Sequence, residues 1–285
     1  MERALRVLWV ASECSPFARE GALGDIVAGV PAALRARGVD ARVVIPRYGW
    51  VSPVTVDNMS RHLAPLAVPL GDAEAWCAVY DTAVPGTEVP VYLLDHEVLF
   101  DRPYLYDPPG AVAHDNLARF AFLSRGALQL TRHLGWTPDV IHAHDWPTAL
   151  VPIYLDTVER RAMLARTAAV LTVHDIAHQG RFSAEEFKVT RLGAEVLHER
   201  SVEEFGAVNL LKGALRHAQA ITACTRDAAA RFQTVEGGAG LDPVMRERAD
   251  VLSALWDDDL GAWDAAAERL LAVYARAVAA RRATP

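Results

Sequence analysis

LRVLWVA (5–11) followed by SECSPFAREGALGD (12–25) is the stretch that decides the fold. The first segment is mostly apolar and predicts a buried strand, and a helical pattern opens behind Gly21. A strand that ends in a glycine-bearing loop ahead of a helix places backbone N–H groups at the carboxyl edge of a parallel sheet. Such edges hold phosphate-bearing ligands. Many α/β domains share this turn without binding a ligand, so the later segments of the chain must show whether this one is a ligand site.

Strand and helix patterns alternate along the rest of the chain, which is typical of βαβ units. Strands are expected at 41–45, 138–143, 167–173 and 220–224, and helices at 22–37, 114–134, 146–155, 205–218, 226–232 and 262–282. Pro31 is expected to kink or restart the first helix. Residues 62–95 carry short β-type runs between turns and predict a small antiparallel excursion. The predicted fold is a single Rossmann-like, three-layer α/β domain.

Composition narrows the class of protein. The chain has 285 residues, 52% of them hydrophobic, and a net charge of −7, which argues against nucleic-acid and membrane surfaces as partners. We find no signal-peptide pattern and no apolar run that is long enough to span a bilayer. The widely spaced Cys14, Cys77 and Cys224 show no metal-type pairing. They predict reduced thiols in a cytoplasmic protein.

Two polar clusters follow neighbouring predicted strands. His142, His144, Asp145 and Trp146 close one strand, and the segment 174–180 closes the next. Any one of these histidines would more often be a hydrogen-bonded residue that orients a loop. Two clusters at adjacent strand ends favour a ligand site instead. Metal binding is the poorer alternative, because no cysteine or third ligand lies close in sequence.

These segments resemble the bacterial glycogen synthase and plant starch synthase family, whose members transfer glucose from ADP-glucose to an α-1,4-glucan. The matching stretches are 19–26, 100–103, 142–147, 172–180, 209–213 and 238–242. The resemblance runs from about Arg6 to Ser253. It implies a GT-B glycosyltransferase, in which two Rossmann-like domains face each other across the active site, and this chain resembles the N-terminal one.

The resemblance also implies roles for single residues. His174 takes the catalytic position, and with Asp25 it would contact the transferred glucose. Arg19 stands where the family has its donor-phosphate lysine, and Asp145 and Trp146 would line the acceptor side. The implied substrate-binding residues are Arg19, Gly21, Asp25, His144, Asp145, Trp146 and Gln179. We expect no cofactor and no metal, and an α-glucan or maltooligosaccharide as ligand.

The chain departs from the family on the donor side. Arg19 replaces lysine. A guanidinium is larger than an ammonium group and presents a rigid fork of donors to a phosphate, so the replacement is not neutral. Glu20 replaces threonine, and one like-charge contact at about 4 Å costs roughly 4 kcal/mol at an effective dielectric constant near 20. Ala22 replaces a glycine. Pro147, Asp175 and His178 replace the family's histidine, asparagine and tyrosine. Together these changes oppose binding of ADP-glucose.

The expected domains are a synthase-like domain at 1–253, a short connector at 254–261 where the family has its second domain, and a closing helix at 262–285. That helix resembles the family's final helix, which packs back on the N-terminal domain. We therefore expect a glycosyltransferase-family domain that does not transfer glucose alone. The alternative is a non-catalytic glucan-binding or regulatory partner of a full-length synthase. A second copy of the chain is a further candidate partner.

Overall fold

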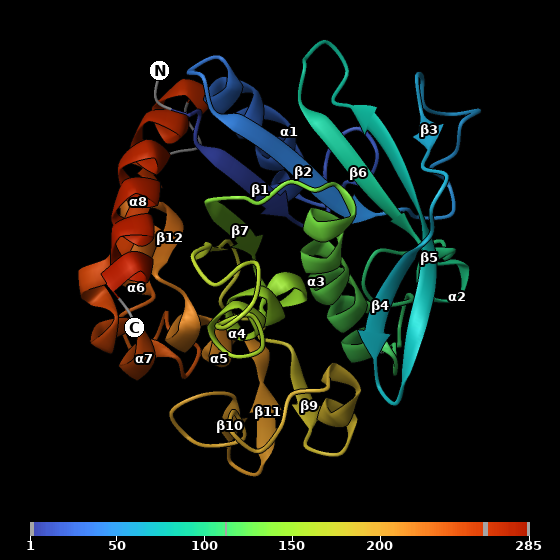
Figure 1. Ribbon diagram of the computed structural model, residues 1–285. Coiled ribbons are helices and arrows are strands. Elements are labelled where there is room, and N and C mark those ends of the chain that lie inside the picture. The colour runs from blue at the N-terminus through green and yellow to red at the C-terminus, as the bar shows by residue number, and fades with distance from the viewer. Residues whose placement is uncertain (1–2, 112, 259–261, 284–285) are drawn as a thin grey trace.

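The computed structural model describes residues 3–111, 113–258 and 262–283. The strands of its main sheet are β1 (Arg6–Val10), β2 (Asp40–Pro46), β3 (Ser60–Arg61), β4 (Leu66–Leu70), β5 (Ala73–Ala83), β6 (Pro90–Asp95), β7 (Val140–His144), β8 (Ala168–Val173), β12 (Ala220–Thr225) and β13 (Leu252–Trp256). They lie in the order β13-β12-β8-β7-β1-β2-β6-β5-β3, with β4 beside β5 (Figure 1). Every neighbouring pair from β13 to β6 is parallel.

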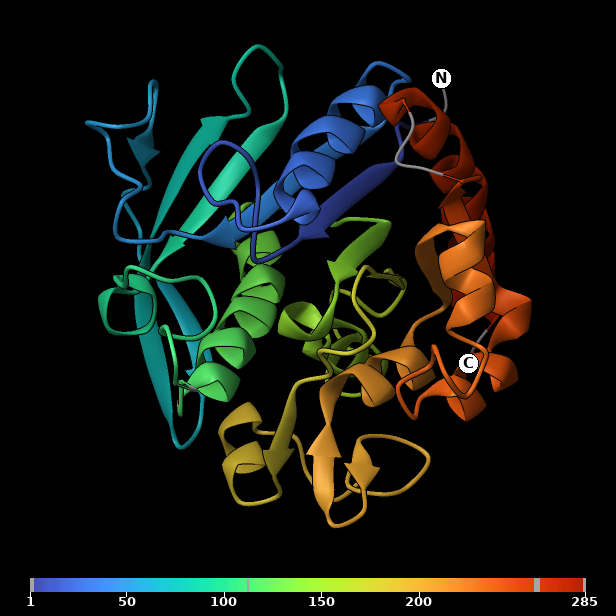
Figure 2. The same cartoon turned by 180° about the vertical axis from the view of Figure 1, so that it is seen from behind.

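The helices cover both faces of this sheet. They are α1 (Ala22–Arg35), α2 (Glu97–Phe100), α3 (Asn116–His133), α4 (Leu150–Asp156), α5 (Leu210–His217), α6 (Arg226–Arg231), α7 (Asp242–Glu247) and α8 (Trp263–Ala283), with short 3-10 turns η1 (Trp146–Thr148), η2 (Glu186–Thr190) and η3 (Ala249–Val251). The β1–α1–β2 and β7–α4–β8 crossovers run in opposite directions across the sheet, so right-handed connections place α1 and α4 on opposite faces. Helix α8 packs beside α1, and α3 and α5 pack beside α4 (Figures 1 and 2). The predicted three-layer α/β fold is confirmed.

The core lies where both layers meet the central strands. Every residue of β7 and of β8 is buried, as expected for parallel strands that are covered on both faces. Trp9 on β1 is fully buried at the centre of this core. On α1, Ile26, Val30 and Leu34 are spaced four residues apart and are buried as well. Pro31 was expected to kink or restart helix α1. The helix does not restart there and runs through Pro31 without a break.

The predicted antiparallel excursion at 62–95 is present, and its last strand, β6, pairs antiparallel with β5 and in parallel with β2, which joins the excursion to the parallel part of the sheet. The helix expected from residue 205 begins at Leu210. Residues 203–209 form β10 (Glu203–Glu204) and β11 (Ala207–Asn209), which pair with β9 (Arg181–Ser183) in a small antiparallel sheet. Asn209 then starts the helix, because its side chain accepts a hydrogen bond from the Lys212 N–H at 3.0 Å.

The C-terminal helix packs back on the domain, as expected. Helix α8 lies against α1, β8, β12 and β13, and buries Leu270 and Tyr274 completely. Its Trp263 indole approaches α1 so closely that a Cβ on Gly29 would lie 2.5 Å from the ring nitrogen. Residues 254–256 of the expected connector lie in β13. Residues 259–261 lie outside the described part. None of the described helices is long and apolar enough to cross a membrane.

Candidate functional site

Four adjacent strands bring polar side chains to one edge of the sheet. In the order β12, β8, β7 and β1, the residues at or just beyond their carboxyl ends include Cys224, His174, His144 and Glu13. The chain leaves β1 toward β2 on one side and returns as β7 on the other, so a topological switch point lies between β1 and β7. In open α/β sheets, ligands bind outside the carboxyl ends of the strands at such a point.

His144 and His174 are in direct contact there. His144 Nδ1 lies 3.1 Å from His174 Nε2. The His144 ring is completely buried, with the Trp9 and His142 rings centred 4.6 Å and 4.4 Å away. Burial, followed by the neighbouring His142 and His174, lowers the pKa of His144 well below its ordinary value. His144 is therefore neutral, and its Nδ1 accepts the hydrogen bond that the charged His174 donates from Nε2.

His174 carries the positive charge of this pair. Its Nδ1 lies 3.2 Å from the Cys224 sulfur. Burial opposes the charged ring, but Cys224, then Asp145 and Glu13, outweigh it and raise the pKa of His174 to about 9. The positive charge of this imidazolium attracts an anionic or hydroxyl-rich ligand to the edge of the sheet.

Asp145 shapes the turn that carries His174. Its backbone has a φ of +54°, a conformation that side-chain-bearing residues rarely adopt. Its Oδ1 accepts the backbone N–H of His174 at 2.7 Å and that of Asp175 at 3.2 Å. Burial raises the pKa of the Asp145 carboxyl, and the nearby His174 works against that shift. Asp145 thus positions His174 and also favours its charged form.

The glycine-bearing loop holds a carboxylate of its own. Glu13 Oε2 accepts the backbone N–H of Glu20 at 2.7 Å and that of Gly21 at 3.2 Å, at the start of α1. Its Oε1 accepts the Tyr106 hydroxyl at 2.6 Å, and the Glu13 side chain is buried. Two of the N–H groups that sequence reasoning offered to a phosphate are therefore already bonded to an internal anion.

The charges of the loop pair among themselves. Arg19, predicted at the donor phosphate, lies 2.8 Å from Asp25 and remains 61% exposed. Asp25 also accepts the Ser15 hydroxyl at 2.7 Å. Burial, then Glu13 and Asp107, raise the pKa of Glu20. The loop is thus locally acidic, and its one predicted phosphate ligand is ion-paired within it.

Trp146 and Gln179 form contacts within the protein. The Trp146 ring packs edge-on against Phe120, with centroids 4.9 Å apart, and lies over Gly180, where a Cβ would come within 2.7 Å of it. Gly180 has a φ of +63°, so this turn requires glycine for two reasons. Gln179 is buried, and its amide nitrogen donates to the Ile176 and Ala239 carbonyls. These residues fix the turn that follows His174.

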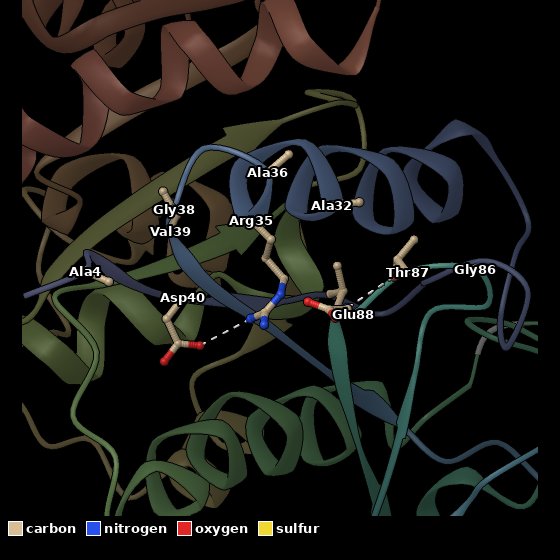
Figure 3. Close-up of a pocket in the computed structure, with 11 residues that line it drawn as sticks. Ala4, Ala32, Arg35, Ala36, Gly38, Val39, Asp40, Gly86, Thr87 and Glu88 are labelled. Carbon is tan, nitrogen blue, oxygen red and sulfur yellow. Dashed lines mark hydrogen bonds and ion pairs between the residues drawn. The ribbon is translucent and has the colours of Figure 1, made fainter.

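A separate hollow of about 560 Å³ lies at the opposite edge of the sheet (Figure 3). Its lining includes Ala4, Gly38 and Asp40 at the amino ends of β1 and β2, and Arg35, whose guanidinium pairs with Asp40 at 3.4 Å. Ligands of open α/β sheets bind at the other edge, so we do not assign the site here. Within the described ranges, no group of three or more His, Cys, Asp or Glu side chains is arranged to hold a metal ion.

Sequence reasoning missed two residues of this site. Glu13 stood inside the opening stretch but was not singled out, and Cys224 was only counted. Glu13 follows β1, which lies beside β7, and Cys224 lies near the carboxyl end of β12, which lies beside β8; this position was the available signal.

The fold and this edge define a Rossmann-like α/β domain with ligand-type side chains at the switch point of its sheet. The sequence matches the family described as Starch synthase catalytic domain over residues 6–247. The chain belongs to this family, as the resemblance predicted.

Individual proteins with similar sequences or structures support the same family membership. Glycogen synthase 1 of Geobacter sulfurreducens is 40% identical over 276 residues, which are 95% of this chain and 55% of that protein. Glycogen synthase of Treponema denticola is 33% identical over 265 residues, covering 91% of this chain and 53% of that one. A solved structure, the catalytic domain of starch synthase IV from Arabidopsis thaliana bound to ADP and acarbose, matches 89% of this chain and 52% of its own with a TM-score of 0.81 and 27% identity. The chain spans about half the length of the relatives that it matches.

Proposed function

We propose that this chain is the glucan-binding half of a glucosyltransferase site, and that these 285 residues alone do not transfer glucose from ADP-glucose. Membership in the starch synthase catalytic domain family supports the substrate class. The Arabidopsis relative was bound to ADP and acarbose, and the two bacterial relatives are named glycogen synthases. The division into a domain at 1–253, a connector and a closing helix remains part of this proposal, as does a cytoplasmic location.

Glu13 carries the proposal. A donor diphosphate at the start of α1 would need the Glu20 and Gly21 N–H groups that Glu13 Oε2 now occupies. A hydrogen bond to a charged group contributes about 1.5–3 kcal/mol, so displacing this carboxylate is costly. The Glu20 carboxylate nearby adds repulsion.

A neutral sugar faces no such barrier. Sugar hydroxyls accept hydrogen bonds from an imidazolium and donate them to carboxylates. His174 supplies the first kind of group when its Nδ1 exchanges the 3.2 Å contact with the Cys224 sulfur for a sugar hydroxyl, and Asp25, at the first turn of α1, supplies the second. We assign these two residues to the glucan, Asp145 to the positioning of His174, and Trp146 and Gln179 to the turn that carries it.

Titration calorimetry with a maltooligosaccharide and with ADP-glucose, run separately on the purified chain, tests the proposal. We expect heat of binding with the maltooligosaccharide and none with ADP-glucose. His174→Ala should weaken glucan binding about tenfold, the equivalent of one charge-assisted hydrogen bond. Binding of ADP-glucose alone would overturn the assignment.

A non-catalytic partner of a full-length synthase is the second candidate, and the same bonded loop favours it. This role predicts that adding the chain changes the rate of a full-length synthase. An unchanged rate at saturating chain would exclude it.

A further inference from the structure

The three cysteines lie in different surroundings. Cys14 is buried, and burial raises the pKa of its thiol far above the ordinary value. Cys77 is also buried, and burial followed by Asp95 raises its pKa to about 12. Cys224 is partly exposed and lies near the carboxyl end of β12. Cys14 and Cys77 are thus unreactive internal comparisons for Cys224.

The Cys224 thiol belongs to a cluster of a nucleophile, two imidazoles and two carboxylates. Its sulfur lies 3.2 Å from His174 Nδ1. His174 Nε2 donates to the neutral His144, so in the charged ring Nδ1 is the nitrogen that holds the proton taken from the Cys224 thiol. Asp145 and Glu13 both favour the positive ring that results. A thiol beside a base whose charged form is stabilised is the arrangement of an activated nucleophile.

We propose that Cys224 is a reactive thiol that forms a mixed disulfide with a small-molecule disulfide, with His174 as the base. In the charged form of His174 the proton of the Cys224 thiol is on Nδ1, and the Cys224 sulfur, left as a thiolate, attacks one sulfur of the disulfide. A bond forms between these two sulfurs, and the original sulfur–sulfur bond breaks. The second half leaves as a thiolate, which takes up the proton and becomes a thiol. Cys224 is oxidised, and the released half is reduced.

The modification changes the candidate site directly. The group added to the Cys224 sulfur would lie at the edge of the sheet beside His174, and the contact between thiol and Nδ1 would be lost. A free thiol would reverse the reaction by a second exchange. Modification therefore acts as a reversible block of this edge, whatever ligand the edge binds.

Oxidised glutathione is the probe for the first test. After incubation with it at pH 7, peptide mass spectrometry should find glutathione on Cys224 and not on Cys14 or Cys77, and a thiol should remove it. This readout does not depend on glucan binding or on glucose transfer, so it can fail or succeed separately from the proposed function. Equal labelling of all three cysteines in the folded chain would overturn the proposal.

The rate of alkylation by iodoacetamide tests the role of His174. The groups that face the pair are His144, Asp145 and Glu13. We expect the rate at pH 6 to stay within about threefold of the rate at pH 8, whereas an unaided thiol slows about 80-fold over this range.

His174→Gln should slow the reaction at pH 7 at least about tenfold, because the base is lost. His178→Gln is the matched control, since His178 pairs with Asp175 on the surface, and its rate should not change. If His174→Gln does not fold, the pH profile of the unmodified chain decides alone. A profile like that of an unaided thiol would contradict the proposal.

Discussion

His144 Nδ1 and His174 Nε2 lie 3.1 Å apart and join the ends of β7 and β8. Burial keeps the first ring neutral, whereas neighbouring acidic groups keep the second one charged. A buried acceptor thus orients a cationic donor at the switch point of the sheet. This pair is the fixed element around which the loops of the site are arranged.

The charge of His174 should depend on Asp145. Asp145→Asn keeps a side-chain oxygen that accepts the backbone N–H of His174, but it removes the negative charge. We expect the pKa of His174 to fall from about 9 toward its ordinary value, because one of the groups that raise it is lost. NMR titration of the His174 ring measures this shift. Asp175→Asn, on the surface next to His174, should leave the pKa unchanged, and an equal fall in both variants would contradict the assignment.

The buried His142 should make stability depend on pH. Burial, followed by His174, holds its pKa well below the ordinary value, so the unfolded chain binds a proton that the folded chain does not. The contribution of the neutral His142 ring to the unfolding free energy is therefore fully present above about pH 6.5. It is lost as the pH falls below that value.

Urea unfolding at pH 7 and at pH 5 measures this effect. We expect the loss of unfolding free energy between the two pH values to be smaller in His142→Gln than in the unmodified chain, by at most about 2 kcal/mol. His178→Gln should leave the loss unchanged, since His178 is exposed. A His142→Gln variant with the same pH dependence as the unmodified chain would refute the explanation.

The packing of α8 should contribute to the stability of the domain. Leu270 is fully buried between α8 and the rest of the core. Leu270→Ala should lower the unfolding free energy by about 2–5 kcal/mol. The control is Glu268→Ala on the exposed face of the same helix, which should change it by no more than about 0.5 kcal/mol. Equal thermal midpoints for the two variants would mean that α8 does not pack as described.

Glu13 should exclude nucleotide from the loop. Glu13→Gln removes the charge that occupies the Glu20 and Gly21 N–H groups, and we expect the affinity for ADP to rise at least about tenfold. Glu20→Gln removes the same charge from the loop but leaves the Glu13 contacts in place, so its effect should be smaller. Calorimetric titration with ADP compares the two variants. Similar affinities for both would contradict a specific role of Glu13.

The sequence allowed the sheet edge to be predicted but not the contacts on it. Alternating strands and helices require parallel strand ends to share one edge, and His144 and His174 follow from that rule. The bond from Glu13 to the Gly21 N–H depends on a side-chain conformation that no periodicity encodes. The helix start at residue 205 was wrong because Phe205, with a φ of +53°, and Gly206 turn the chain between β10 and β11.

Glucose transfer tests the central claim most directly. The purified chain is incubated with radiolabelled ADP-glucose and glycogen, and label incorporated into glycogen is compared with a heat-inactivated control. We predict no incorporation above the control, because Glu13 occupies the loop amides and Arg19 is paired with Asp25. Incorporation above the control that is lost in His174→Ala would contradict the account.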